Sequence, residues 1–317
     1  MSKPRRFYRD IDGILLLDKA LGLSSNAALQ EVRALFGAKK AGHAGSLDPL
    51  ASGVLPIGFG QATKVCGRLL NSGKTYRVRV RLGARTDSGD LEAPVVERAP
   101  VPTLSEGAVD DVLRTFEGEQ TQIPPMHSAL KFEGKRLYEL ARRGETVERA
   151  PRRIVLKNLR RIAFLDDALE FDVHCSKGTY IRTLAADVAA RLGTLGYVEG
   201  LRRLSVDPFG DLQAYTVKHL AQLSPGERDA LLLSSDAAFL DLPRVDLSQD
   251  EERRLLLGQT LDCAENSIFS GQARAYGRQG RFLGLVEEHA GNRLRPLRLF
   301  LDSNAPGARA SAAVSDP

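Results

Sequence analysis

The chain has 317 residues, of which 43% are hydrophobic and 27% charged, enough for roughly two globular domains with full cores. Its formal net charge is +5 at pH 7, which favours a polyanionic partner only where the charge is clustered. No apolar run approaches the length of a bilayer span, and no apolar stretch follows the basic N-terminus, so we expect neither a membrane segment nor a signal peptide.

The cysteines and histidines predict a reducing compartment and no metal. Cys66, Cys175 and Cys263 lie far apart, which argues against a disulfide framework and a zinc site, and we therefore expect the protein in the cytoplasm. The five histidines do not pair at metal-ligand spacings. The sequence also lacks the GxxxxGK[ST] and GxGxxG patterns of nucleotide sites, so we expect a reaction without metal or cofactor.

The first elements are a basic arm, a strand and a helix. Residues 1–9 form the arm, and residues 12–19 predict a buried strand because four consecutive apolar residues are bounded by turn formers. Ser24 or Ser25 can cap the helix that follows, and Gly37 ends it.

Residues 41–56 form a glycine-punctuated stretch, expected to be a loop, with Asp48 directly before Pro49. The proline disfavours the α region for Asp48, and the glycines let the backbone come close to a ligand. Such a loop presents a carboxylate rather than burying it. An isolated Asp-Pro pair also commonly starts a turn. Without metal or cofactor motifs, Asp48 is the lead candidate for a nucleophile or general base.

Residues 76–82 give the clearest strand pattern, because apolar side chains that begin with Tyr76 alternate with Arg77, Arg79 and Arg81. Tyr76 is either a core aromatic residue or part of a site. The polar stretch 85–90 lacks the ligand spacing of a calcium loop, and we interpret it as an ordinary loop.

The middle of the chain carries a basic, irregular segment. Residues 122–131 show neither helical nor strand periodicity, and a short basic helix over 135–143 is expected after them. Arginines crowd this region, at positions 142, 143, 149, 152 and 153. The segment is either a loop that grips an extended or looped partner or an ordinary surface excursion, and repeated basic clusters favour phosphate contacts.

A hairpin over 153–164 and 169–175 leads into the next helix, for which Thr179 is the expected cap. Tyr180 and Arg182 then lie in the first turn of a helix that follows a strand, a frequent position for functional side chains.

The pattern changes around residues 242–244, which indicates a linker to a smaller unit over 244–302. A helix over 248–257 and several short β-like pieces separated by glycines predict a β-rich domain. The tail over 303–317 is mostly Ala, Ser, Gly and Pro, and we expect it to be disordered because it has little apolar surface to bury.

Four blocks resemble motifs of the TruB family of tRNA pseudouridine synthases, and the likeness covers nearly the whole chain. They are Gly-Ile-Leu-Leu-Leu-Asp-Lys at 13–19, Gly-His-Ala-Gly-Ser-Leu-Asp-Pro-Leu-Ala-Ser-Gly at 42–53, Lys-Thr-Tyr at 74–76 and Ser-Lys-Gly-Thr-Tyr-Ile-Arg at 176–182. The resemblance implies an α+β fold with a mixed, largely antiparallel sheet flanked by helices over 10–243. It also implies an RNA-gripping insertion at about 124–152 and a PUA-like RNA-binding domain over 244–302.

The resemblance further implies that uridine 55 in the T loop of tRNA is isomerised to pseudouridine without a cofactor, by a monomer that needs no protein partner. Asp48 would be the catalytic carboxylate and Arg182 its ion-pair partner, since a nearby cation favours the ionised acid. His43 would take the place of the flipped base, and Tyr76 would stack on that base. Tyr180 and Leu201 would line the pocket, with Lys19 supporting it.

Two alternatives stay open from the sequence. The protein could act mainly as an RNA-binding factor that folds tRNA, although binding alone gives no reason for Asp48 together with Arg182. A guide-RNA-dependent synthase of related design would need partner proteins, and the insertion at 124–152 favours a stand-alone enzyme.

Overall fold

The structure, a computed structural model, describes residues 8–128, 130–165, 167–262, 271–289 and 293–300. Most of the expected basic arm, the expected disordered tail and Cys263 lie outside these residues. None of the helices in the described ranges is both long enough and apolar enough to cross a membrane.

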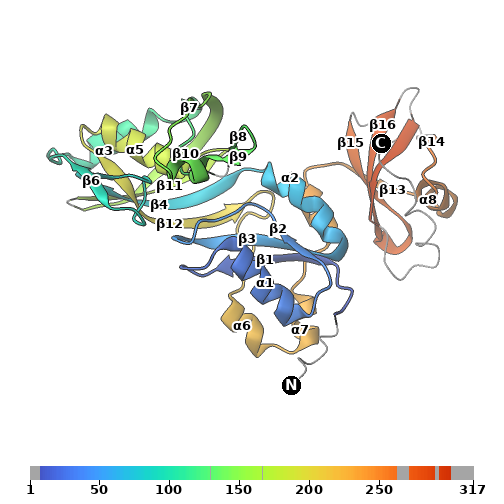
Figure 1. Cartoon of the computed structure of the whole chain (residues 1–317). Coiled ribbons are helices and arrows are strands. Elements are labelled where there is room, and N and C mark those ends of the chain that lie inside the picture. Colours follow the sequence, from blue (N-terminus) through green and yellow to red (C-terminus); the bar gives the residue numbers. More distant parts are fainter. Residues whose placement is uncertain (1–7, 129, 166, 263–270, 290–292, 301–317) are drawn as a thin grey trace, which may run out of the picture.

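One large sheet organises most of the chain (Figure 1). Its strands follow the order β1-β3-β12-β4-β11-β10-β7, and β2 pairs with β3. Their bounds are Gly13–Lys19 (β1), Ala41–His43 (β2), Ala51–Phe59 (β3), Lys74–Leu82 (β4), Gly118–Gln122 (β7), Arg152–Leu165 (β10), Ala168–Cys175 (β11) and Gly196–Val206 (β12). Among these described strands β3 and β12 pair in parallel and the other pairs are antiparallel, which confirms the predicted mixed, largely antiparallel sheet.

Helices cover the sheet in two places, as Figure 1 shows. Helix α1 (Ser25–Phe36) packs on β1 and β3, with Phe36 stacked on Phe59 at a centroid distance of 4.8 Å. Helices α3 (Glu106–Arg114) and α5 (Ile181–Arg191) bury their apolar faces against β4, β10 and β11. Each large apolar side chain removed from water in this way contributes about 1.5–3 kcal/mol.

Short helices and strands complete the part of the chain before residue 244 that the structure describes. The helices are η1 (Gly60–Val65), α2 (Cys66–Leu70), α4 (Leu137–Ala141), α6 (Val217–Gln222), α7 (Pro225–Ala230) and η2 (Ser235–Phe239), and the strands are β5 (Ala84–Thr86), β6 (Val95–Arg98), β8 (Lys131–Phe132) and β9 (Lys135–Arg136).

The alternation predicted for residues 76–82 is confirmed in β4. Val78 and Val80 are fully buried, and the arginines occupy the other face. Those arginines form ion pairs with carboxylates of neighbouring strands and turns: Arg77 with Asp172, Arg79 with Glu199, and Arg81 with Glu199 and Asp167. The positive charge on this face of β4 is therefore balanced by carboxylates of the same domain.

The prediction of a loop over 41–56 is wrong at both of its ends. Strands β2 and β3 pair with each other, and only residues 44–50 between them form a loop. Glycine, which normally weakens a strand, here allows two strands to approach. Gly53 has φ +103°, and a Cβ at this position would lie 2.1 Å from the carbonyl oxygen of Arg203 on β12.

Two helix starts also differ from the predictions. Thr179 does not cap α5, because its Oγ1 donates to the Ser176 carbonyl at 3.0 Å and Tyr180 is the N-cap residue. The expected basic helix over 135–143 is shorter, because residues 131–136 form the hairpin of β8 and β9 and only α4 follows. The local hydrogen bonds of turns decide these starts, and helical periodicity does not reveal them.

The C-terminal part is a separate five-stranded sheet to the right of α2 in Figure 1. Its strands are β13 (Arg244–Asp246), β14 (Leu261–Asp262), β15 (Gln272–Tyr276), β16 (Phe282–His289) and β17 (Arg293–Leu299), with helix α8 (Gln249–Leu256) and the turn η3 (Arg278–Gly280) beside them. Phe282 and Phe300 pack against Phe239 of η2, each at a centroid distance of 6.3 Å. This arrangement agrees with the predicted small β-rich, PUA-like domain.

Candidate active site

The loop over residues 44–50 presents Asp48, whose side chain is 53% exposed. The loop is anchored at Leu47, whose backbone N–H donates to the Ser25 hydroxyl at 2.7 Å and whose carbonyl accepts from the same hydroxyl at 2.9 Å. The Ala51 N–H donates to the Asp48 carbonyl at 3.0 Å. The backbone is thus fixed while the carboxylate stays open to a substrate.

Arg182, in the first turn of α5, lies beside Asp48 of this loop. Its Nη2 is 3.6 Å from Oδ2 of Asp48, and its side chain is only 13% exposed. The structure therefore brings together the two residues assigned to catalysis. A separation of 3.6 Å is within ion-pair range but longer than a strong hydrogen bond.

Asp90 is the nearer carboxylate to Arg182, and sequence reasoning missed it. Nη1 of Arg182 lies 3.1 Å from Asp90 Oδ2, and the Asp90 side chain is 4% exposed. The guanidinium also donates to the carbonyls of Ser88 at 3.1 Å and His127 at 2.6 Å. The stretch 85–90 is rich in carboxylates and hydroxyls without the spacing of a calcium loop, and this composition was the available signal for a functional role. The partner of Asp90, Arg182, is distant in the sequence, so the pairing could not be predicted.

Glu92 adds a further acidic group near Asp48. Burial raises its pKa, and the negative charges of Asp90 and Asp48 raise it further, while Arg182 opposes them. Glu92, Pro49, Leu50 and Leu201 line a cavity of about 470 Å³ next to the loop. Leu201 lines this cavity together with Arg77 and Arg79, which lie on the opposite face of β4 from Tyr76, and Asp48 is not among its lining residues. A role for Leu201 in a pocket at Asp48 therefore stays a prediction.

The two predicted aromatic residues lie at strand and helix ends around the same region. Tyr76 begins the apolar face of β4, and burial raises the pKa of its hydroxyl. The backbone of Tyr180 is fixed by Gln122, whose amide oxygen accepts from the Tyr180 N–H at 2.8 Å and whose amide nitrogen donates to the Tyr180 carbonyl at 3.0 Å. Gln122, the last residue of β7, was not anticipated.

Lys19 and His43 flank the loop from β1 and β2. Lys19 is 1% exposed, and its Nζ donates to the carbonyls of Ala20 at 3.0 Å and Leu23 at 2.6 Å. Burial lowers the pKa of Lys19, and the charge of Asp48 opposes that shift. Burial and then the charge of Arg203 lower the pKa of His43, so its imidazole is neutral at pH 7. Its Nδ1 is buried and has no hydrogen-bond partner among the described residues.

Together these side chains form a half-open site with the half-exposed Asp48 carboxylate, the Arg182 cation that it shares with Asp90, and two tyrosines. Within the described ranges no group of three or more His, Cys, Asp or Glu side chains is arranged to hold a metal ion. The arrangement suits acid, base or nucleophilic chemistry on a planar ligand, carried out by Asp48.

Comparison with known proteins defines the family. The model of the N-terminal domain of TruB family pseudouridylate synthases matches residues 33–181, and the model of the C-terminal domain of pseudouridine synthase II TruB matches residues 243–300. A "tRNA pseudouridine synthase B" of Methylobacillus flagellatus is 48% identical over 93% of this chain and 97% of its own. One of the same name from Chromohalobacter salexigens is 45% identical over 93% of this chain and 96% of its own.

The chain belongs to the TruB family.

Solved structures agree on the fold of this TruB family member. A chain in a crystal structure of a Cbf5-Nop10-Gar1 complex matches with a TM-score of 0.71 at 20% identity, covering 95% of this chain and 91% of that one. A chain in an H/ACA RNP bound to a substrate RNA containing 2′-deoxyuridine gives 0.70 at 19% identity, covering 96% and 92%. As a TruB family member, the protein is an enzyme that isomerises uridine to pseudouridine in RNA.

Proposed function

We propose that this TruB family enzyme acts on uridine 55 in the T loop of tRNA, by flipping the base into the site beside Asp48. The observation that carries the proposal is the half-exposed Asp48 carboxylate placed 3.6 Å from the buried guanidinium of Arg182. The name that the curated relatives share, tRNA pseudouridine synthase B, supports tRNA as the substrate.

The reaction breaks the bond between N1 of uracil and C1′ of the ribose and forms a bond between C5 and C1′. The proton on C5 is lost and N1 gains one, so nothing is consumed. Asp48 either attacks the nucleotide or removes a sugar proton, and both routes require it to be ionised. Arg182, whose guanidinium lies 3.6 Å away, would hold that carboxylate in place.

The surrounding side chains would hold the flipped nucleotide. Extraction of the base costs a few kcal/mol in lost stacking, and Tyr76 recovers part of this cost by stacking on the flipped ring. His43, neutral and with a buried Nδ1 that lacks a partner among the described residues, would occupy the space that the base leaves. Tyr180 and Leu201 would line the pocket, and Lys19 would hold the backbone at its edge.

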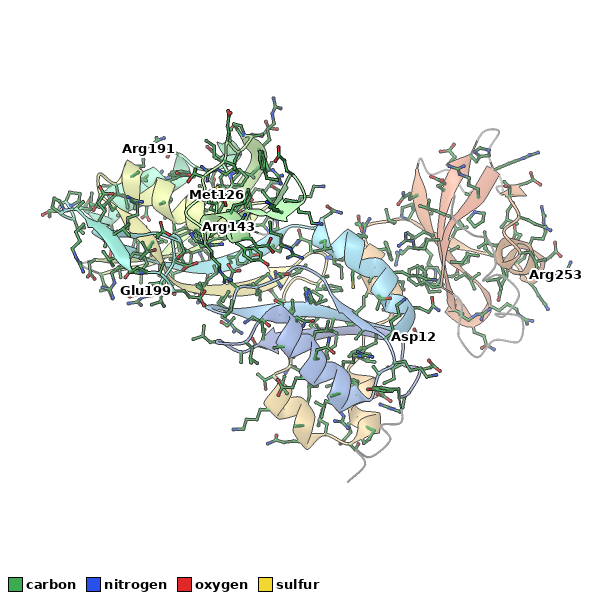
Figure 2. The ribbon with its side chains drawn as sticks, viewed as in Figure 1. Asp12, Met126, Arg143, Arg191, Glu199 and Arg253 are labelled. Carbon is green, nitrogen blue, oxygen red and sulfur yellow. The ribbon has the colours of Figure 1, made fainter. Side chains whose placement is uncertain are left out.

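The insertion over about 124–152 would grip the RNA. Along residues 131–157, which lie within this insertion and just after it, a series of cations forms no ion pair with a carboxylate among the described residues: Lys131, Lys135, Arg136, Arg142, Arg149, Arg152, Arg153 and Lys157. Figure 2 shows Met126 and Arg143 of the insertion in the same lobe as the helices that cover β4. The arginines of β4 are paired with carboxylates, whereas these cations have no such partner among the described residues, which supports this segment as a contact for phosphate.

These assignments divide the chain into a catalytic domain over 10–243 and an RNA-binding domain over 244–302. Because the insertion supplies the grip, the enzyme would work as a cytoplasmic monomer without a protein partner. The competing function, an RNA-binding factor that folds tRNA, would use the same basic surface but leave uridine 55 unchanged.

The test is incubation of purified protein with an unmodified T-arm stem-loop that carries tritium at C5 of its uridines. Release of tritium without other factors, lost when uridine 55 is replaced by cytidine, is the expected result. Binding without release would favour the folding factor. Release only after addition of a guide RNA and other proteins would favour a guide-dependent synthase.

A further inference from the structure

Arg203 is a cation buried under the Asp48 loop. It lies on β12, paired in parallel with Gly53 of β3 and in antiparallel register with Tyr76 of β4. The residue is 1% exposed, and no carboxylate among the described residues forms an ion pair with it. A buried guanidinium is costly unless its donors are satisfied, so its contacts indicate its use.

Backbone carbonyls on both sides of Asp48 accept its hydrogen bonds. Nε donates to the Val54 carbonyl at 2.6 Å, and Nη2 donates to the Gly45 carbonyl at 2.9 Å. Gly45 has φ +89°, and a Cβ there would lie 3.3 Å from Nη1 of Arg203, so the loop closes directly over the guanidinium. One planar side chain thus joins Gly45, which precedes Asp48 in the loop, to Val54 of β3, which follows it.

The backbone of Arg203 pairs with Tyr76 in the register of β12 with β4, so the side chain that holds the Asp48 loop comes from the strand beside Tyr76. The two neighbouring buried lysines are held by other carbonyls: Lys19 by Ala20 and Leu23, and Lys74 by Leu69, Leu70 and Ser72. Arg203 therefore links the Asp48 loop to β12 through two donors of one planar side chain, which a single ammonium does not reproduce.

We propose that Arg203 is a positioning residue for the isomerisation, whose guanidinium fixes the Asp48 loop against β12, the strand that pairs with Tyr76. The inference rests on the proposed function. Arg203 touches neither substrate nor reacting atoms, and it acts through the residues that do. Displacement of a reacting group by about 1 Å can cost about 10²-fold in rate, so the expected effect is on kcat.

The test compares Arg203→Lys with Arg202→Lys. Arg202 is the next residue on the same strand, 46% exposed and bonded to Asp18 at 2.9 Å, so it controls for loss of a guanidinium at this place in the fold. We expect Arg203→Lys to lower kcat for the T-arm stem-loop by about 10²-fold with KM and stem-loop affinity little changed. Arg202→Lys should retain the wild-type kcat.

A second measurement needs no turnover. Amide hydrogen exchange of residues 41–56 should speed up in Arg203→Lys, because the carbonyls of Gly45 in the loop and Val54 in β3 lose a fixed donor, and should match wild type in Arg202→Lys.

Unchanged kcat and unchanged exchange in Arg203→Lys would overturn the inference. It is equally overturned if kcat falls only in proportion to the folded fraction, followed by circular dichroism, because Arg203 would then serve folding alone. If wild-type protein released no tritium while loop exchange still depended on Arg203, the proposed function would fail and the link between loop and strand would stand.

Discussion

The Arg182 guanidinium lies closer to Asp90, at 3.1 Å, than to Asp48, at 3.6 Å. The Asp90 side chain is 4% exposed and that of Asp48 is 53% exposed, so the two acids have different surroundings. Asp90 is the closer partner of this largely buried cation, and we infer that the longer contact with Asp48 orients that carboxylate without binding it tightly. A catalytic carboxylate held too firmly by a cation would be a poor nucleophile or base.

Asp48→Asn should abolish pseudouridine formation. The amide has nearly the same shape but can neither attack nor accept a proton as a carboxylate does. Tritium release should fall below detection while stem-loop affinity, measured by filter binding, stays close to wild type. Turnover retained by this variant would exclude Asp48 as the catalytic acid.

Asp90→Asn should reduce kcat without abolishing it, by roughly 10–100-fold. Removal of the buried charge leaves Arg182 with one carboxylate, so the guanidinium should move toward Asp48 and hold it more tightly. Single-turnover rates give the measurement. Asp87→Asn serves as the control, because the 69%-exposed Asp87 lies in the same loop and contacts His127 rather than Arg182. Equal effects of the two changes would argue against a special role for Asp90.

Arg182→Lys should lower kcat by about 10²-fold, because a lysine cannot reach Asp90, Ser88 and His127 with one ammonium. The matched control is Arg191→Lys at the other end of α5, where Arg191 lies over the Phe116 ring (Figure 2). Kinetics of Arg182→Lys that match those of the control would remove Arg182 from the site.

Arg152→Ala combined with Arg153→Ala should weaken stem-loop binding and flatten its salt dependence. Removal of one cation that binds phosphate should reduce the slope of log affinity against log salt by roughly 0.7–0.9. Arg114→Ala, on α3 and paired with Asp111, is the control. If the double change leaves the slope of log affinity against log salt unchanged, these arginines do not contact phosphate.

The stability of the protein should depend on Lys74 at alkaline pH. Burial lowers the pKa of Lys74 from 10.5 to about 8. Between about pH 8 and 10.5 the Lys74 side chain holds its proton in the unfolded chain but not in the folded one. The free energy of unfolding therefore rises with pH across this range, by at most about 3 kcal/mol. Urea titrations from pH 7 to 10.5 should show that the free energy of unfolding of the wild type rises relative to that of Lys74→Met. A constant difference would contradict this assignment.

Local patterns allowed much of the fold to be predicted, and the exceptions share a physical cause. The period of two in β4 and the capping serine and terminal glycine of α1 are short-range signals, and both elements appear where expected. Strand β3 was missed because its Gly53 serves a contact with Arg203 that is 150 residues away in the chain. Tertiary contacts of this kind override local propensity.

The same limit applies to the site. Asp48, Tyr76 and Arg182 belong to blocks that resemble family motifs, so the likeness named them together. Asp90 and Arg203 were placed in an ordinary polar loop and a basic strand, because their roles depend on which residues the fold brings beside them. Nothing in the residues around either position marks it as buried.

The two hydrogen bonds between Gln122 and the Tyr180 backbone bear on how this enzyme could be recombined with its relatives. Gln122 and the His127 carbonyl both contact the start of α5. The first residues of the basic segment therefore help to position Arg182. A chimera that exchanges RNA-gripping segments should therefore be joined after His127. A junction before Gln122 would transplant part of the scaffold that holds Arg182.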